Sequence, residues 1–462
     1  MPLNRKATTG VCLGILFLTG LIALGSHFTR PPEYDGRSLE AWLIALASLD
    51  YRERQEADRA LRTLGPEAVP TLIRALTMRE TTLVLAWRFV RERLPPPPSP
   101  RLPEARIRVQ AARLLGSLGP AALPSVPALI DQLNDPESEV ARAAAAALRR
   151  IGPLAVPRLI EALSHRDPGI RRAAVGLLSS RPDFGDDVIQ SLPAVIRMLE
   201  DSDPRARAAA AEALEKLPAR QTAAIEALER SLGDPSSTVR SAAASALGNL
   251  GSTADARAGK LEPLLTDPDG LVRVAAAKAH WQISGTTARS VPTLVSLLTD
   301  RDAHWRAALV LREIGPAAAD LAVPALLERL QVEFVHRPSR TPASATLALA
   351  RMGPAAVPGL TRLLEATDPT VRMGAAMALI DHRAGAASAT PGLLKMLDDP
   401  DVEVRIVAAQ TLGAIGPAAM EAVPSLRRIA AESRNYLQSS AENALTAILG
   451  SDARNEMPVR PE

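Results

Sequence analysis

The sequence predicts an all-α fold, a right-handed α-α superhelix (a solenoid) of about 12 helix pairs, preceded by one N-terminal transmembrane or signal helix. Three observations predict it: an apolar motif recurring about every 33 residues, two amphipathic helical patterns in each repeat, and a low aromatic content. A chain of 462 residues exceeds the size at which one globular core keeps growing, so a linear array is expected. The 4 Trp, 3 Tyr and 5 Phe residues suit thin, closely packed helices rich in alanine and leucine.

The first 29 residues have a positive start and an apolar middle. Arg5 and Lys6 are followed at 7–29 by 23 residues without Asp, Glu, Lys or Arg, which as a helix would span about 34 Å. A small-x-small triplet at 23–25 resembles a cleavage site, so a signal peptide and an uncleaved anchor over about 8–28 are both open, and the length favours the anchor. Either outcome predicts an extracytoplasmic chain, anchored in the inner membrane of a bacterium and facing the periplasm, or secreted after cleavage.

The repeats follow a motif of the type Ala-Val-Pro-x-Leu-x-x-Leu. Its proline position recurs from Pro127 to Pro424 over 297 residues in nine steps, which is 33 residues per step. Thirteen residues after it, an apolar residue such as Val404 or Trp305 begins a stripe at helical spacing, so each repeat is two amphipathic helices. Gly-Pro pairs close many second helices, because glycine supplies a left-handed C-cap and proline cannot continue the helix.

The spacing also sets the domain limits. Residues 30–66 are expected to form an N-terminal capping helix pair in which Trp42 covers the end of the stack. Residues 67–120 form the first regular repeat, residues 121–450 continue the array, and residues 451–462 are expected to be a disordered tail.

The turn between the two helices carries a regular Asp-x-x-x-Arg step. An Asp directly before Pro, as at Asp167-Pro168, is typical of an N-cap followed by a first-turn proline. We interpret the row as a structural ladder, in which each Asp caps its helix and each Arg pairs with the Asp of its own or the next repeat. Its members are Asp167 and Arg171, Asp203 and Arg207, Asp269 and Arg273, Asp302 and Arg306, Asp368 and Arg372, and Asp401 and Arg405.

The Ala-Val-Pro-x-Leu phrase, the Asp-x-x-x-Arg step and the terminal Gly-Pro pair resemble HEAT repeats. The 33-residue unit with its alanine-rich second helix is similar to the short, phycobilisome-lyase-like HEAT subfamily, and the likeness covers roughly residues 38–450. The resemblance implies a scaffold whose first helices line the convex side and whose second helices line the concave, ligand-facing side.

An insertion at 81–104 breaks the period and is the predicted partner-binding element. Its first half, 82–94, has a helical stripe, and the proline-rich stretch at 95–103 predicts extended polyproline II. Insertions into solenoids often add a binding function, and the alternative is that this helix packs back on the stack. The candidate partner-binding residues are Trp87, Arg88, Phe89, Arg91, Arg93 and Arg101.

No catalytic motif is evident. The only cysteine, Cys12, lies in the leader, and no P-loop, Gly-x-Ser-x-Gly or dinucleotide fingerprint occurs. Deoxyhypusine hydroxylase, a HEAT-like enzyme, uses His-Glu pairs at a di-iron site, and this chain has no His-Glu dipeptide. The formal net charge of +3 includes Arg5 and Lys6, so little excess is left for nucleic acid.

The sequence therefore predicts a non-enzymatic interaction scaffold for a protein or peptide, without cofactor, metal or nucleic acid. The alternatives are a lyase-like or enzyme-accessory factor that presents a substrate or cofactor, and a HEAT-fold enzyme.

Overall fold

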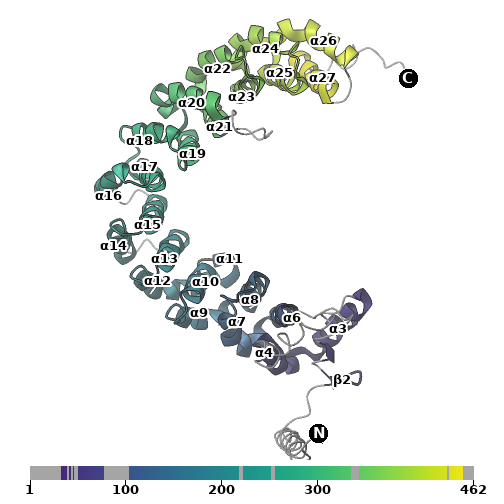
Figure 1. Ribbon diagram of the computed structural model, residues 1–462, viewed down its shortest axis with the longest axis vertical. Coiled ribbons are helices and arrows are strands. Elements are labelled where there is room, and N and C mark those ends of the chain that lie inside the picture. Colours follow the sequence, from purple (N-terminus) through teal and green to yellow (C-terminus); the bar gives the residue numbers. More distant parts are fainter. Residues whose placement is uncertain are drawn as a thin grey trace, which may run out of the picture. The chain divides into compact units, whose positions relative to one another are not determined.

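The computed structural model describes residues 33–38, 41–42, 45, 50–77, 104–217, 222–250, 255–333, 343–433 and 436–450 (Figure 1). They divide between two compact units, unit 1 (Met1–Val195) and unit 2 (Ile196–Glu462). The predicted leader, the tail at 451–462 and all of the insertion except Glu104, which begins a helix, lie outside the described residues. The predictions for those segments stay predictions.

Unit 1 starts with a short hairpin and continues as stacked helix pairs. Strand β1 (Glu33–Tyr34) pairs antiparallel with β2 (Arg37–Ser38), and both turn residues have the positive φ that a two-residue hairpin turn of type I′ requires. The helical elements that follow are α3 (Tyr51–Leu64), η1 (Gly65–Ala68), α4 (Val69–Leu76), α6 (Glu104–Ser117), η2 (Gly119–Ser125), α7 (Val126–Asp131), α8 (Ser138–Ile151), η3 (Gly152–Ala155), α9 (Val156–Ala162), α10 (Pro168–Leu178), α11 (Arg181–Phe184), η4 (Gly185–Ser191) and, at the boundary between the units, α12 (Leu192–Met198).

Trp42 lies against the hairpin. Its side chain is 4% exposed, and the indole Nε1 donates a hydrogen bond to the Tyr34 carbonyl oxygen at 3.0 Å. The Arg37 guanidinium lies 4.8 Å from the centroid of the indole ring, a cation–π contact. The hairpin therefore holds the buried tryptophan through both its polar and its aromatic character.

Unit 2 repeats the two-helix pattern to the end of the described residues. Its elements are α13 (Pro204–Lys216), α14 (Thr222–Ser231), α15 (Ser237–Leu250), α16 (Asp255–Leu261), η5 (Glu262–Thr266), α17 (Gly270–Ser284), α18 (Ser290–Ser296), η6 (Leu297–Thr299), α19 (His304–Ile314), η7 (Gly315–Ala318), α20 (Ala319–Glu333), α21 (Ser344–Leu349), η9 (Gly353–Ala356), α22 (Val357–Leu363), α23 (Pro369–Ile380), η10 (Arg383–Ala389), α24 (Thr390–Met396), α25 (Val402–Ile415), η11 (Gly416–Ala422), α26 (Val423–Glu432) and α27 (Tyr436–Leu449).

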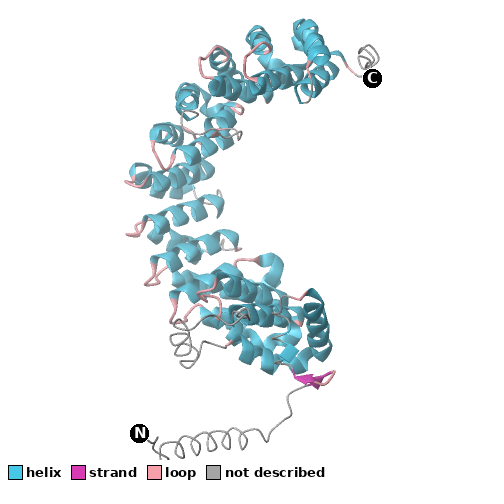
Figure 2. Cartoon of the chain, turned by 45° about the vertical axis from the view of Figure 1, so that its right-hand side comes forward, coloured by secondary structure: helices cyan, strands magenta, loops and turns pink. Residues whose placement is uncertain are grey.

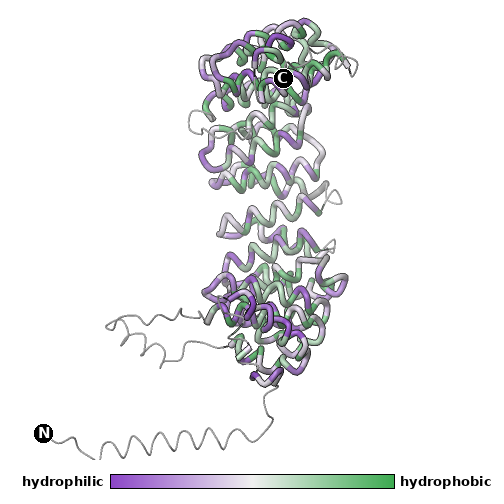
Figure 3. The backbone as a smooth tube through the Cα atoms, turned by 90° about the vertical axis from the view of Figure 1, so that its right-hand side faces the viewer, coloured by the Kyte–Doolittle hydropathy of each residue, from purple (hydrophilic) through white to green (hydrophobic). Residues whose placement is uncertain are grey.

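Within each unit the second helices of successive repeats pack side by side. In unit 1, α6 packs on α8, and in unit 2 the row runs α13, α15, α17, α19, α21, α23, α25, α27. In unit 2 this row forms the inner side of the stack, and the first helices α14, α16, α18, α20, α22, α24 and α26 form the outer side (Figures 1 and 2). Hydrophobic and hydrophilic residues alternate along the helices (Figure 3), as expected where each helix buries one face.

The glycines of the Gly-Pro pairs have positive φ, but their conformation is not the predicted left-handed helical one. Gly152 has φ 77° and ψ −148°, and Gly416 has φ 74° and ψ −143°, a region open essentially to glycine alone. The following proline disfavours a helical ψ at the preceding residue, which explains the extended ψ. The proline then occupies the first turn of a 3₁₀ helix, so it starts the next element as well as ending the last one.

The predicted register is wrong in the repeat that contains Trp305. Helix α19 has 11 residues and its N-cap is Ala303, whereas α25 has 14 residues. Ala303 is fully buried and takes the first apolar position, while Trp305 is 44% exposed. The turn between the proline and α19 differs in length from the other turns. A fixed count forward from the proline therefore assigned Trp305 to the buried stripe.

One apolar stretch among the described residues, Val402–Glu432, has the length and hydropathy of a membrane span. It comprises α25, η11 and α26 and breaks at Gly416. Half of its most apolar window is buried within the protein, so we assign it to the core of the stack.

Candidate functional site

The six candidate partner-binding residues of the insertion, Trp87, Arg88, Phe89, Arg91, Arg93 and Arg101, lie outside the described residues. Two other features of the described chain carry organised polar groups. One is the row of turn aspartates and arginines, and the other is a hollow on the second helices of unit 1.

Five of the six predicted aspartates occupy N-cap positions. The Asp167 carboxylate accepts a hydrogen bond from the backbone N–H of Gly169 at 2.7 Å, which satisfies one of the free donors at the start of α10. The same contact links Asp203 to Arg205, Asp269 to Leu271, Asp368 to Thr370, and Asp401 to Glu403.

The arginines pair with an aspartate of the next repeat, one of the two predicted alternatives, but the acceptor is not the residue at the N-cap. Nε and Nη2 of Arg207 donate to Asp234 at 2.7 and 2.9 Å, and the same nitrogens of Arg240 donate to Asp267 at 2.8 Å each. The acceptor follows its arginine by 27 residues and stands two positions before the N-cap of the next repeat. The third nitrogen, Nη1, donates to a backbone carbonyl of the arginine's own turn, as from Arg207 to Asp201 at 2.7 Å. Related pairs join Arg108 to Asp135, Arg273 to Asp300, and Arg372 to Asp399.

The predicted pair of Asp302 and Arg306 does not form a rung of the ladder, by which we mean an arginine–aspartate ion pair between neighbouring repeats. Asp300 takes over the turn, because its carboxylate accepts the backbone N–H groups of Asp302 and Ala303 at 2.9 and 3.0 Å. The Arg306 guanidinium instead lies 5.0 Å from the centroid of the Trp305 indole. In α25 the ladder residue Arg405 stands 11 residues before the closing Gly416, and the same count back from Gly315 gives His304, so Arg306 lies two residues past the ladder position.

Electrostatics of the rungs favour the ion pair. Burial opposes ionisation of Asp267, but the hydrogen bonds from Arg240 and from the Asp269 N–H, with the charges of Arg240 and Arg273, outweigh burial and lower its pKa. The hydrogen bond to Asp267 raises the pKa of Arg240 despite burial. Three nitrogens of Arg240 are thus engaged within the protein, so the rung ties neighbouring repeats together and offers little to a ligand.

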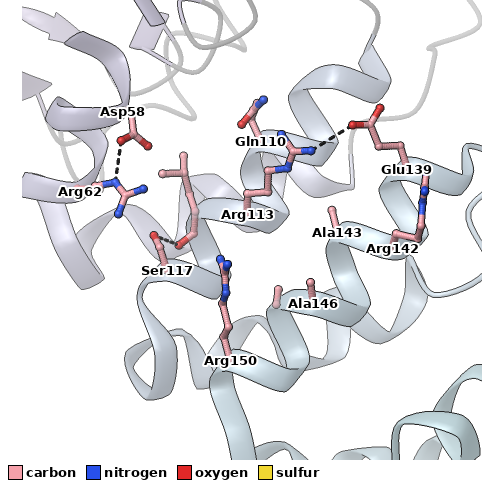
Figure 4. A pocket seen from close by; sticks show the side chains of 12 residues that line it. Asp58, Arg62, Gln110, Arg113, Ser117, Glu139, Arg142, Ala143, Ala146 and Arg150 are labelled. Carbon is pink, nitrogen blue, oxygen red and sulfur yellow. Dashed lines mark hydrogen bonds and ion pairs between the residues drawn. The ribbon is translucent and has the colours of Figure 1, made fainter. Parts of the chain in front are cut away.

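The hollow on unit 1 lies over three second helices, α3, α6 and α8, and has a volume of about 500 Å³ (Figure 4). Alanines of α8, among them Ala143, Ala146 and Ala147, form part of its surface, and arginine side chains project around it. We call it the arginine groove. Its lining residues are Asp58, Arg62, Gln110, Arg113, Leu114, Ser117, Glu139, Arg142, Ala143, Ala146, Ala147 and Arg150.

Two of the four groove arginines are paired with carboxylates at the rim. Arg62 donates to Asp58 at 2.8 Å, and Arg113 donates to Glu139 at 3.1 Å. All four of these side chains are between 44% and 60% exposed, so each pair contributes little to stability. No ion pair of Arg142 or Arg150 is found among the described residues.

Small residues set the depth of the groove. A Cβ atom on Gly116 of α6 would stand 2.9 Å from the Cα atom of Ala147 on α8, so the two backbones approach more closely than side chains would allow. The alanines of α8 add little bulk above this contact. Long arginine side chains therefore surround a shallow floor of small side chains.

Two histidines lie against the core, His280 buried and His382 half-buried. His280 lies near the Ser290 hydroxyl, with 3.3 Å between Nδ1 and Oγ, and His382 Nε2 lies 3.2 Å from the Leu349 carbonyl oxygen. Burial lowers the pKa of both imidazoles. Within the part of the chain that the structure describes, no three His, Cys, Asp or Glu side chains gather as metal ligands would.

The stacked pairs and the groove on their second helices define the class of protein, a helical-repeat solenoid. The family model for HEAT repeats matches residues 126–194, 156–248, 192–279 and 380–446, so the repeats in these segments are HEAT repeats. No curated protein matches the chain in sequence.

Solved structures with this fold include importin beta and Kap121p. Yeast importin-beta (Kap95p) aligns with a TM-score of 0.58 at 15% identity, over 91% of this chain and 62% of that one. Importin beta crystallised in an ammonium sulfate condition gives 0.54 at 16%, over 89% and 55%, and Kap121p bound to Ste12p gives 0.50 at 14%, over 90% and 53%. This chain spans between about half and three fifths of their lengths, and at these identities the likeness concerns the fold.

Proposed function

We propose that this chain is a non-enzymatic scaffold that holds a protein or peptide partner on the face of its second helices. The observation that carries the proposal is the arginine groove, a hollow of about 500 Å³ with an alanine floor and arginines around it. Solved relatives of the same fold include Kap121p bound to Ste12p, in which the solenoid holds another protein.

The chemistry of the groove suits recognition better than catalysis. Its two carboxylates, on Asp58 and Glu139, each accept a hydrogen bond from an arginine, and the Ser117 hydroxyl donates to the Leu114 carbonyl oxygen at 2.7 Å. A serine nucleophile needs a base beside its hydroxyl, and the Ser117 hydroxyl is instead engaged by the carbonyl of its own helix. What the groove presents to a ligand is positive charge, N–H donors and apolar surface.

We further propose that the scaffold works outside the cytoplasm, held by its N-terminal segment. The motivation is the Arg5-Lys6 pair followed by 23 uncharged residues. Fusion of alkaline phosphatase, which is active only after export, to the C-terminus of the full chain tests this. We expect an active fusion, and a fluorescent cytoplasmic reporter at the same place should be dark; the reverse pattern would refute the location.

Affinity capture from the native envelope tests the scaffold. The tagged full-length chain is cross-linked in the cell and captured, and the recovered proteins are tagged in turn for reciprocal capture. We expect one or a few proteins that pass both directions and are absent from a control of equally abundant tag on an unrelated exported protein. Recovery of none above that control would refute the scaffold.

A deletion of residues 81–103 locates the contribution of the insertion. If the insertion binds the partner, the deleted chain keeps its thermal unfolding temperature and loses the captured protein. If it packs on the stack, the unfolding temperature falls. The cut leaves Glu104, the first residue of α6, in place.

A further inference from the structure

Positive charge is concentrated in the arginine groove. Four arginines and two carboxylates line it, a local excess of +2, whereas the 462-residue chain as a whole carries a formal net charge of +3. Aligned charges at a concave surface attract a ligand of opposite sign and orient its approach. The groove therefore selects for negative charge.

Two groove arginines keep donors available for a ligand. Arg142 Nε donates to the Ser138 carbonyl of its own helix at 3.3 Å, and the Arg150 side chain makes no hydrogen bond or ion pair with another described residue. Both side chains are exposed. The adjacent Arg149 differs, because it pairs with Asp183 at 3.3 Å. A guanidinium presents five N–H donors in a planar fork, which matches the two oxygens of a carboxylate.

The spacing fits an extended peptide. Arg142 and Arg150 are eight residues apart on α8, which corresponds to about 12 Å along the helix axis. An extended chain advances about 3.3 Å per residue, so acidic side chains four residues apart span about 13 Å. Between the two arginines, Ala143, Ala146 and Ala147 leave room for the backbone of such a peptide.

A nucleic acid fits this charge pattern poorly. A duplex presents one phosphate charge for about every 1.7 Å of its axis, and proteins that hold it neutralise many phosphates at once. The groove has two guanidinium groups without a carboxylate partner among the described residues, and aromatic side chains for base stacking are not among its lining residues.

We propose that the arginine groove binds an acidic peptide segment of the partner protein, with carboxylates four residues apart paired to Arg142 and Arg150. This inference rests on the proposed scaffold function and adds to it the chemical class of the bound segment. The rim pairs of Arg62 and Arg113 are weak enough to exchange their own carboxylates for those of the ligand.

Fluorescence anisotropy with the full-length chain in detergent tests the inference. The probe is a fluorescein-labelled decapeptide with two Glu-Glu pairs spaced four residues apart, and the matched probe has glutamine at each glutamate. We expect the glutamate peptide to bind at least about tenfold more tightly, with the difference shrinking at high salt. Equal affinity for the two peptides would overturn the proposal.

A double variant tests whether Arg142 and Arg150 contact the peptide. Arg142→Gln with Arg150→Gln keeps good helix formers at two exposed positions, and circular dichroism checks that the fold is kept. We expect it to bind the glutamate peptide about tenfold more weakly. The matched control is Arg158→Gln with Arg166→Gln, an equal loss of charge at exposed sites outside the groove, which should bind as wild type does. Equal loss in both variants would overturn the proposal.

Competition separates the acidic peptide from other anions. Stronger displacement of the probe by a single-stranded oligothymidylate than by unlabelled glutamate peptide, or complete displacement by inorganic phosphate at equal concentration, would overturn it. Capture from the envelope separates this inference from the scaffold itself. If the Arg142→Gln, Arg150→Gln chain recovers as much partner as wild type, the groove assignment fails and the scaffold stands; if wild type recovers none, the scaffold fails.

Discussion

Replacing Asp267 by asparagine breaks one rung of the ladder while leaving its turn in place. Asp267 accepts two hydrogen bonds of 2.8 Å from Arg240 and one of 2.9 Å from the backbone N–H of Asp269. Asparagine caps a turn about as well as aspartate, so the backbone contact is retained. The charge is lost, and an amide N–H₂ group now faces the guanidinium.

The magnitude follows from burial. The side chains of Arg240 and Asp267 are 15% and 9% exposed, so the guanidinium that is left behind is largely shielded from water. Removing one partner of a buried ion pair costs about 3–5 kcal/mol, and the residual exposure places Asp267→Asn near the lower end, at about 3 kcal/mol. Because repeats unfold semi-independently, the loss should be greatest in the repeats that contain α15 and α17.

The assay combines urea unfolding, followed by circular dichroism, with hydrogen exchange resolved by peptide. The matched control is Asp58→Asn, because Asp58 pairs with Arg62 at the same 2.8 Å but with 44% and 60% of the side chains exposed, and it should cost about 0–1 kcal/mol. A double-mutant cycle with Arg240→Met isolates the pairwise energy. If Asp267→Asn costs no more than Asp58→Asn, the ladder does not hold the repeats together and our interpretation of it is refuted.

Three further outcomes are expected. Gly116→Ala should destabilise the chain by about 1–3 kcal/mol in urea unfolding, because its Cβ would meet the Ala147 backbone, whereas Gly176→Ala, with open space around it, should stabilise by about 0.5–1 kcal/mol; the same sign for both would contradict the close-packing argument. Thermal stability should begin to fall below about pH 6.5, because burial lowers the pKa of His382 and the unfolded chain takes up that proton first, and His382→Gln should flatten this step. Stability should fall again below about pH 4, because the lowered pKa of Asp267 lets the unfolded carboxyl protonate before the folded one, and Asp267→Asn should reduce this acid loss; an unchanged acid limb would argue against the rung.

The repeat architecture could be predicted because its signals are local and periodic. The Asp-Pro step at Asp167 and Asp203 marks a helix start within a few residues, and the structure has these carboxylates at N-caps. The phase of an individual helix was less predictable. In α19 the count forward from the preceding proline pointed to Trp305. A count of 12 residues back from Gly315, the C-cap of the same helix, would have found the buried Ala303, because that count does not cross the turn whose length varies.

The ion-pair partners were missed because two aspartates stand two residues apart in the same turn. Spacing along one helix cannot say which of Asp267 and Asp269 reaches the preceding repeat. A signal was present: the first aspartate recurs at 33-residue intervals at 201, 234, 267 and 300, even where the second becomes Ser236. The aspartate that recurs more regularly is the one that forms the ion pair between neighbouring repeats.

The arginine groove was missed for the opposite reason. Its arginines occupy different positions within their repeats, so a comparison of the repeats does not identify them as a group. Gln110 and Arg113 on α6 correspond in the repeat to Ala143 and Ala146 on α8. The groove arginines of α8 stand instead at 142 and 150. Departures from the repeat pattern on the second helices, rather than the pattern itself, would have pointed to this surface.

The most direct test of the scaffold places a photoreactive residue in the groove of the full-length chain in its native cells. Ala146, exposed on the groove floor, and Arg158, exposed on the first helix α9, are each replaced by a benzophenone-bearing amino acid. Our account predicts that the partner found by reciprocal capture forms an adduct at position 146 and not at 158. An adduct of equal yield at both positions, or one at 158 alone, would contradict the claim that the second-helix face of unit 1 holds the partner.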